Sequence, residues 1–235
     1  MNKLQPVALL ATGKLMRSFL LDLAGFRERI GPVKAPSLRV ASRISNNLQS
    51  GFPVGDCQDL GGCNAIFICV PDEMLCEIVR EMAEAPLDWA GRAVFLCDSR
   101  HTSDSLESVA VLGAFTASLN ATPGPGRMIL AEGHPVAIAS VKPIIGRTAR
   151  LIRIEADQKA KYFRALEIAE LCGPLAALTG ERLRDSGLSP ADAKPMVASL
   201  FGDAVRDYVK SGRKVLSNST HRTAVLKRVL SAANL

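Results

Sequence analysis

The first turns of a helix predicted in the last third of the chain carry two polar residues and one aromatic residue. They are Lys159, Tyr162 and Phe163. Spacings of three and four residues place them on one helix face. A lysine ammonium can donate a hydrogen bond to a substrate carbonyl oxygen or carboxylate, and a neighbouring tyrosine can assist proton transfer. Lys159 is therefore the first candidate catalytic residue, with Tyr162 beside it.

The same helix turn has a second interpretation. Lys159 and Lys161 would then be solubilising residues on an exposed face. Surface helices carry their charges on the side away from the core, so this interpretation needs no substrate. The sequence leaves both open.

A third candidate, Ser99, follows a predicted strand at residues 92–97. Loops at the carboxyl ends of strands carry ligands in open α/β sheets, so Ser99 or the nearby His101 is expected to touch a nicotinamide ring or a substrate. The alternative is a helix start in this stretch, with Ser103 or Asp104 as the N-cap.

A turn near the N-terminus has the position of a dinucleotide-binding loop. An apolar run at residues 7–11 is followed by Gly13 and then by a helical pattern. In such units a G-x-G-x-x-G loop permits a tight turn and close approach of the backbone to pyrophosphate. Only the central glycine is present here, and Met16 occupies the third place. The residues assigned to the cofactor are Ala11, Thr12, Gly13, Lys14 and Leu15.

The nature of the cofactor is predicted from a second segment. Residues 38–41 are expected to form the second strand, which Ser42 and Arg43 follow. NAD-specific proteins usually place Asp or Glu there to bind the ribose 2′-hydroxyl. A hydroxyl and a guanidinium instead suit a 2′-phosphate, because arginine offers several N–H donors to phosphate oxygens. The expected cofactor is NADP, and the alternative is a solvent-exposed arginine.

These candidates need a scaffold, and the apolar pattern predicts an α/β domain over residues 1–154. Apolar runs predict further strands at 64–70, 113–119, 127–131 and 149–154, and helical spacing predicts helices at 72–83 and 135–145. Alternation of strands and helices indicates a Rossmann-like, mostly parallel sheet with helices on both faces.

Residues 155–235 are predicted to form a smaller all-helical domain. Helical spacing is strong from Asp157 onward and the strand pattern stops. Breaks at Ser186-Gly187 and at 217–219 divide this region into about three helices, one of which starts at Ser189-Pro190.

Composition excludes several classes of protein. With 48% hydrophobic and 22% charged residues, the chain is typical of a globular protein rather than a disordered or fibrous one. Its longest apolar runs fall well short of the ~20 residues that cross a bilayer. Gly13, Lys14 and Arg17 interrupt the first apolar run, which argues against a signal peptide. We expect a soluble, cytoplasmic protein with no membrane partner.

The cysteines and histidines do not indicate a metal site. The six cysteines form no C-x-x-C pair and are interpreted as small buried hydrophobic residues. The three histidines are dispersed and lack metal-ligand spacing.

The chain has a net charge of +6, with basic residues gathered near the C-terminus. Such a cluster suits an acidic partner or nucleic acid, but the preferred interpretation is a solvated helix face.

Four segments, residues 7–19, 40–43, 69–72 and 155–162, together resemble a known family. Over nearly its whole length the chain resembles Rossmann-like proteins with a C-terminal domain of unknown function, which are similar to pyrroline-5-carboxylate reductases and 6-phosphogluconate dehydrogenase-like enzymes. The resemblance implies an NADP-binding domain, a helical domain that often forms homodimers, and a cleft for a small-molecule substrate. It implies that Lys159 points into that cleft, and it adds to the expected cofactor contacts Val70, Pro71 and Asp72.

The chain also departs from that family. Histidines typical of it are missing from the turn at 97–100, from 119–121 and from the position of Phe163. Two hypotheses result. The chain is an NADP-dependent oxidoreductase acting on a small imine or carbonyl compound, or a descendant without catalysis that serves as a ligand-binding or dimeric interaction module.

Overall fold

The computed structural model describes residues 5–123, 128–146 and 149–211. The chain forms two compact units, Met1–Phe163 and Arg164–Leu235. The boundary lies inside helix α5 (Ala156–Glu170), later than the change of sequence pattern after residue 154, because the first turns of α5 pack with unit 1. Each unit is described by itself.

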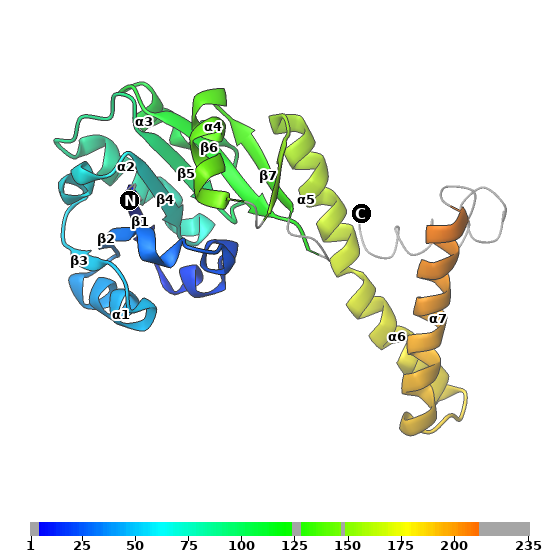
Figure 1. The fold of residues 1–235 in the computed structure, drawn as a ribbon. Helices are drawn as coiled ribbons and strands as arrows, with labels where there is room; N and C mark the ends of the chain where they lie inside the picture. The colour runs from blue at the N-terminus through cyan, green and yellow to red at the C-terminus, as the bar shows by residue number, and fades with distance from the viewer. Residues whose placement is uncertain (1–4, 124–127, 147–148, 212–235) are drawn as a thin grey trace. The chain divides into compact units, whose positions relative to one another are not determined.

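Unit 1 is built on one eight-stranded sheet, whose spatial order is β3-β2-β1-β4-β5-β6-β7-β8 (Figure 1). Neighbouring strands are parallel except for β6 and β7, which are antiparallel. The predicted Rossmann-like, mostly parallel sheet is confirmed. The strands are β1 (Val7–Ala11), β2 (Ile30–Lys34), β3 (Phe52–Val54), β4 (Ala65–Cys69), β5 (Ala93–Cys97), β6 (Phe115–Ala121), β7 (Met128–Gly133) and β8 (Arg150–Arg153).

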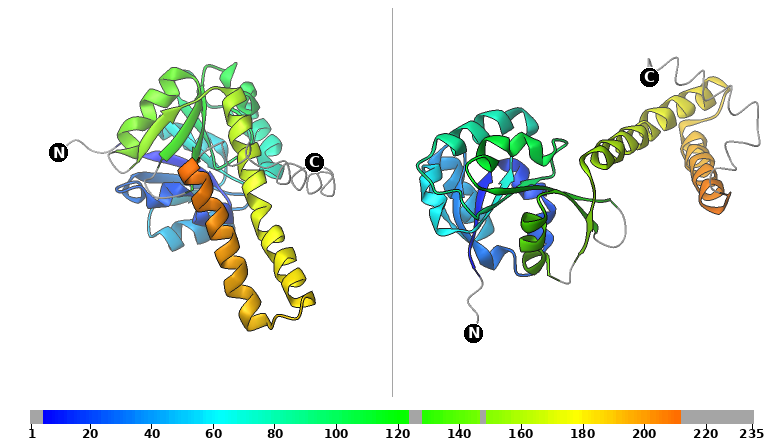
Figure 2. Two further views of the ribbon diagram at one scale, coloured as in Figure 1. Left: turned by 90° about the vertical axis from the view of Figure 1, so that its right-hand side faces the viewer. Right: turned by 90° about the horizontal axis from the view of Figure 1, so that it is seen from above.

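Helices cover both faces of this sheet, as predicted (Figure 2). Successive residues of a strand point to opposite faces, so a strand covered on both sides is apolar throughout. Leu9 and Phe67 pack on one face with α1 (Leu38–Leu48) and α4 (Pro135–Ile145). On the other face, Leu10 and Ile68 pack with α2 (Leu75–Glu84) and α3 (Glu107–Ala110).

The second strand was misplaced by the sequence pattern. The expected strand at 38–41 is the first turn of α1, and the true second strand is β2. Ser37 starts the helix, since its hydroxyl accepts a 3.3 Å hydrogen bond from the Val40 amide. The error arose because Gly31 and Pro32, which are typical of loops, lie inside β2, a strand whose five residues are all buried.

The helical pattern after β1 does not form an α-helix. Instead two short 3-10 helices, Gly13–Arg17 and Phe19–Asp22, follow one another. Ser18 separates them with extended backbone angles (φ −74°, ψ 142°). Further 3-10 helices span Arg27–Arg29, Cys57–Gly62, Asp72–Met74 and Ser103–Leu106.

Unit 2 contains the end of α5 and the helices α6 (Cys172–Asp185) and α7 (Pro190–Ser211), which lie side by side (Figure 2). The predicted break at Ser186-Gly187 is confirmed, and Gly187 takes a left-handed conformation there (φ 97°). A further break at Leu171 separates α5 from α6. The break predicted at 217–219 lies outside the described residues. No described helix is long and apolar enough to span a membrane.

The cysteines divide into two groups. Cys57, Cys63, Cys69 and Cys97 are buried, as predicted, but Cys76 and Cys172 are exposed. Cys76 is exposed because it lies on the solvent face of α2, whose core face holds Leu75, Ile78, Val79 and Met82. All six thiols are free.

Candidate functional site

Three loops meet at the carboxyl edge of the central strands. Ala11 of β1 is in register with Cys69 of β4, and β5 continues the parallel pairing with β4. The loops that follow these strands begin at Thr12, Val70 and Asp98. Ligands of open α/β sheets bind at this edge, so the topology brings most of the predicted site residues together.

The loop after β1 leaves open space at its single glycine. The Thr12 amide donates a 3.2 Å hydrogen bond to the Cys69 carbonyl, and the Thr12 hydroxyl accepts from the Lys14 amide at 3.3 Å. A Cβ added to Gly13 would meet no atom within 4 Å. Leu15 is fully buried, whereas Met16 is half-exposed. The space over Gly13 therefore admits a ligand group, although no long helix follows to direct its dipole at a phosphate.

Lys14 supplies a positive charge at the same place. Its ammonium donates a 3.2 Å hydrogen bond to the Val70 carbonyl and lies 3.8 Å from a carboxylate oxygen of Asp72. Both side chains are partly exposed. The lysine thereby links the loop after β1 to the loop after β4, and its charge faces the edge where a dinucleotide would carry its phosphates.

Asp72 is held by the loop after β5. The buried Ser99 hydroxyl donates a 2.7 Å hydrogen bond to Asp72, and the Arg100 amide donates a second at 3.3 Å. Burial raises the pKa of the Asp72 carboxyl, but these two hydrogen bonds and the Lys14 charge together hold that pKa below its usual value. Asp72 is thus a carboxylate anchored by Ser99.

Asp98 is a second carboxyl at this edge. It follows β5 in a left-handed conformation (φ 52°), which is uncommon outside glycine. The Ser18 hydroxyl donates a 2.7 Å hydrogen bond to it, and this contact fixes the break between the two 3-10 helices. Burial raises the pKa of Asp98, although the bond from Ser18 and the Lys14 charge act in the opposite direction.

Lys159 is buried, with 1% of its surface exposed. Its ammonium donates hydrogen bonds to the His101 carbonyl and, at 2.8 Å, to the Ser118 hydroxyl. It also lies 5.8 Å from the ring centroid of Phe163. Burial lowers its pKa to about 8, even though the negative charge of Glu132 favours the protonated form. The interpretation of Lys159 as a solubilising residue is wrong; it does hold for exposed Lys161, which pairs with Asp157 at 2.7 Å.

Glu132, which no sequence pattern indicated as a site residue, balances the charge of this buried lysine. It lies on β7 and accepts a 2.8 Å hydrogen bond from the Ser118 hydroxyl, so that Ser118 links the two charges. The amide and hydroxyl of Ser103 also donate to Glu132, at 2.8 and 2.7 Å. A 3-10 helix does begin in this stretch, but its N-cap is Thr102 rather than the expected Ser103 or Asp104, and the Ser103 hydroxyl binds Glu132 instead.

Tyr162 is the partly exposed member of the predicted pair. Its hydroxyl donates a 3.4 Å hydrogen bond to the Ala121 carbonyl at the end of β6. Burial, and then the negative charge of Asp98, raise the pKa of the phenol. Tyr162 therefore keeps its proton at neutral pH and lies near the Asp98 carboxyl.

Ser42 and Arg43 do not follow a strand. Both lie in the second turn of α1, where the Ser42 hydroxyl donates a 2.8 Å hydrogen bond to the Leu38 carbonyl of its own helix. Arg43 is exposed, and exposed Arg39 lies four residues earlier on the same face. The residues that follow β2 are Ala35, Pro36 and Ser37.

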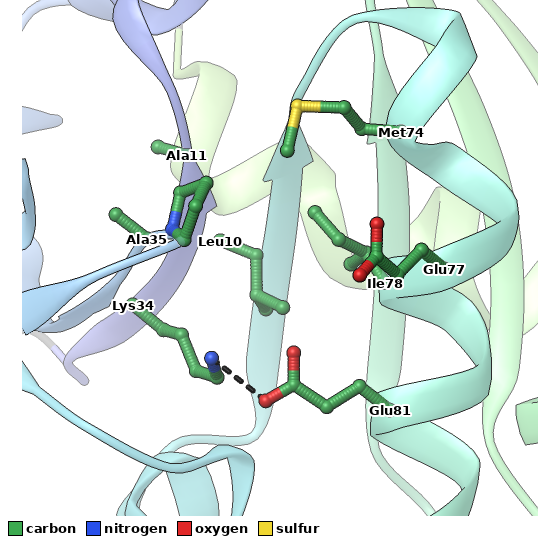
Figure 3. Close-up of a pocket in the computed structure, with 9 residues that line it drawn as sticks. Leu10, Ala11, Lys34, Ala35, Met74, Glu77, Ile78 and Glu81 are labelled. Atoms are coloured by element: carbon green, nitrogen blue, oxygen red, sulfur yellow. Dashed lines mark ion pairs between the residues drawn. The ribbon is translucent and has the colours of Figure 1, made fainter.

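A pocket of about 200 Å³ lies beside the carboxyl ends of β1 and β2 (Figure 3). The ends of both strands and the residues just after β2 form one wall, and α2 with Met74 just before it forms the other. The buried Lys34 ammonium pairs there with Glu81 at 2.7 Å. Periodicity could not identify this pocket, because β2 was not predicted and its walls are far apart in sequence.

No protein-family model and no curated protein matches this chain. Several solved structures of other proteins do match it. A reductive aminase from Aspergillus terreus, in complex with NADPH4, cyclohexanone and allyl amine, is similar with a TM-score of 0.69 and 12% identity over 99% of this chain and 87% of its own. An imine reductase from Bacillus cereus has a TM-score of 0.67 and 10% identity over 92% of this chain and 78% of its own.

A pyrroline-5-carboxylate reductase from Coxiella burnetii is also similar, with a TM-score of 0.59 and 13% identity over 99% of this chain and 92% of its own. At such identities the likeness shows the fold. The chain has the Rossmann-like fold with a C-terminal helical region that these reductases have, which confirms at the level of fold the resemblance to pyrroline-5-carboxylate reductases.

Proposed function

We propose that this chain is an NADP-dependent reductase of a small imine or carbonyl compound. The observation that carries the proposal is the juxtaposition of Lys14, Asp72, Asp98 and Tyr162 at the carboxyl edge of the sheet. This edge is where dinucleotides bind in the fold. The solved structures of the same fold include NADPH complexes of a reductive aminase.

The residues present fit a dinucleotide. The open space over Gly13 and the Lys14 charge suit a pyrophosphate, with Ala11, Thr12 and Leu15 shaping the turn. Val70, Pro71 and Asp72 would border the other side of it. For a 2′-phosphate we propose exposed Arg43 with Arg39, because both guanidiniums lie on one face of the helix that follows β2, and Ser42 lies between them in sequence.

The reduced nicotinamide would supply a hydride to the carbon of a C=N or C=O bond. Tyr162 is the proposed catalytic residue, since its phenol keeps its proton at neutral pH and can give it to the substrate nitrogen or oxygen. Lys159 and Ser99 are proposed as positioning residues. Lys159 holds the His101 carbonyl and Ser99 holds Asp72, so both fix the loop after β5.

NADPH titration tests the proposal. Calorimetry with NADPH and NADH should show binding with a preference for NADPH, and NADPH oxidation should occur with some member of a panel of cyclic imines and ketones. Lys14→Met should weaken NADPH binding about tenfold, as expected for a lost charged contact to phosphate. Lys142→Met, an exposed lysine of α4, is the matched control. Absence of binding by either dinucleotide would refute the proposal.

A second candidate is a ligand-binding or interaction module without catalysis. Two observations favour it: short 3-10 helices replace the helix after β1, and the Lys159 ammonium is covered. If the altered loop after β1 is what prevents nucleotide binding, the double variant Ala11→Gly, Met16→Gly should create or strengthen that binding. No gain in nucleotide binding by the double variant would show that the loop is not the cause.

We also propose that the chain forms a homodimer through the helical region. Several large apolar side chains of α6 and α7 are exposed, and exposed apolar patches mark interaction surfaces. They are Leu178, Met196, Leu200, Val205 and Val209. Sedimentation equilibrium of the full chain tests this, and Leu200→Glu with Val205→Glu should shift a dimer to monomer. A monomeric wild-type chain would exclude it.

A further inference from the structure

Two buried cysteines end the neighbouring central strands β4 and β5 (Figure 1). Cys69 is the last residue of β4, and Cys97 is the last residue of β5. The parallel register pairs Ile68 with Leu96, so Cys69 and Cys97 are the next pair along these strands. Both side chains belong to the core on the same face of the sheet. The two thiols therefore lie side by side at the carboxyl edge.

The spacing of these thiols suits a disulfide. Neighbouring strands lie about 4.8 Å apart, and the Cα atoms of disulfide-bonded cysteines are about 4.4–6.8 Å apart. The Cys97 thiol is hydrogen-bonded to the Cys69 thiol, so the two sulfur atoms already meet. A bond between directly opposite residues departs from the ideal Cβ separation of about 3.8 Å, and such bonds are easily reduced. The pair is therefore suited to reversible oxidation.

The Cys69 thiol is connected to the candidate site through Ser18. It donates a 4.0 Å hydrogen bond to the Ser18 hydroxyl, which in turn donates to the Asp98 carboxylate at 2.7 Å. Asp98 also follows Cys97 directly in the chain, in a left-handed conformation (φ 52°). A disulfide would remove the S–H donor of Cys69 and pull on the residue before Asp98. Oxidation of the pair would thus displace the carboxylate that lies near Tyr162.

We propose that Cys69 and Cys97 are a redox modification site, at which hydrogen peroxide forms a reversible disulfide that slows the reductase. The effect on turnover rests on the proposed function, whereas formation of the disulfide does not. In the first step one sulfur attacks the peroxide, so that an S–O bond forms, the O–O bond breaks and one water leaves. In the second step the other sulfur attacks the resulting sulfenic acid, and the S–O oxygen leaves as a second water. Two thiols are oxidised by two electrons, and one peroxide is reduced to two waters.

The two cysteines have different roles in this reaction. Burial, and then the neighbouring Cys69 thiol, raise the pKa of Cys97, which makes Cys97 the poorer nucleophile toward peroxide. The Cys97 thiol also donates to the Phe95 carbonyl of its own strand, at 3.9 Å. Cys69 is therefore assigned the attack on peroxide, and Cys97 the attack on the sulfenic acid. Because both thiols are buried, we expect them to react more slowly than exposed Cys76 and Cys172.

The test uses the full chain in a Cys76→Ser, Cys172→Ser background, because those exposed thiols would react first. The folded protein is treated with hydrogen peroxide, free thiols are blocked with N-ethylmaleimide, and disulfides are mapped by mass spectrometry after digestion with chymotrypsin and trypsin. Cleavage isolates Cys69 in residues 68–75 and Cys97 in residues 96–100. The expected result is a linkage between these two peptides that dithiothreitol removes.

Cys63→Ala is the matched control, since it removes a buried thiol from the core on the opposite face of the sheet and should keep the linkage. Cys97→Ala should lose it. The linked chain should oxidise NADPH at least about tenfold more slowly than the reduced chain, as expected when a catalytic group is misplaced. Dithiothreitol should restore the rate, and peroxide should not slow Cys97→Ala.

Two results would overturn the inference. Absence of the linkage in the folded chain would overturn all of it, and a linkage with unchanged turnover would overturn the regulation. If neither the reduced nor the oxidised chain oxidises NADPH, the reductase proposal fails instead. The linkage between Cys69 and Cys97 then decides by itself whether the modification site exists.

Discussion

The Ser99 hydroxyl donates a 2.7 Å hydrogen bond to the carboxylate of Asp72, which precedes it by 27 residues in the chain. This contact joins the loops that follow β4 and β5. Ser99 is fully buried, whereas the Asp72 side chain is partly exposed. One loop therefore fixes the charge that the other presents at the edge of the sheet.

Replacing Ser99 by alanine should destabilise the fold and raise the pKa of Asp72. Loss of a hydrogen bond to a charged group costs about 1.5–3 kcal/mol. Because the pKa of Asp72 is lowered in the folded chain, its stabilising contribution exists above the unfolded value of 3.8 and is lost as the pH falls through the folded value. The difference between wild type and Ser99→Ala in urea unfolding should therefore shrink in acid. Ser108→Ala, an exposed serine of α3, should show no such difference.

Lys159 and Glu132 should be energetically coupled through Ser118. Lys159→Met leaves Glu132 buried without a compensating charge, which should cost on the order of 3 kcal/mol. Glu132→Gln in the same chain should recover part of that loss, because the remaining groups are then neutral. A double-mutant cycle from urea unfolding measures the coupling. Strictly additive single and double variants would show that the two residues act independently.

The same lysine predicts a pH dependence at alkaline pH. Its pKa is about 8 in the folded chain and 10.5 without the fold. The unfolded chain thus binds more protons between these values, so wild-type stability should rise with pH there relative to Lys159→Met, by at most about 1.4 kcal/mol per pH unit. Below the folded pKa the difference should be constant. If the unfolding free energies of the wild type and Lys159→Met differed by the same amount at every pH, the lowered pKa of Lys159 would be contradicted.

Gly13→Ala should weaken cofactor binding and leave the stability of the fold almost unchanged. A Cβ at Gly13 meets no atom within 4 Å, so the stability of the free protein should change by about 0.5 kcal/mol or less. The added methyl would occupy the space proposed for pyrophosphate, and NADPH affinity should fall at least about tenfold. Thermal unfolding measures the stability of the free protein, and calorimetry measures its affinity for NADPH. Undiminished NADPH affinity would place the phosphates elsewhere.

Gly133→Ala provides the contrasting case, because this glycine ends β7 next to Glu132. Its φ is +122°, and a Cβ there would lie 2.6 Å from the Thr116 carbonyl oxygen. The substitution should destabilise the fold by several kcal/mol, as about 1–3 kcal/mol of backbone strain adds to the steric clash. Stability close to that of the wild type would mean that β6 and β7 can separate at this point.

Several features were determined by the sequence alone. The apolar runs at Val7–Ala11, Ala65–Cys69 and Ala93–Cys97 and the helix Pro135–Ile145 lie where periodicity placed them. These signals are local, since an apolar run or a helical spacing needs no distant partner to be read. The position of Ser99 at the carboxyl edge of the sheet also follows from the sequence, because it comes directly after a predicted strand.

Tertiary structure decided the rest, because those features depend on residues far apart in the chain. Gly31 and Pro32 become strand only through pairing with β1 and β3. Lys159 is buried rather than solvated because Ser118 and Glu132, on strands paired across the sheet, supply its partners. The pocket beside β1 and β2 exists only because α2 packs next to β2, two elements that are far apart in the sequence.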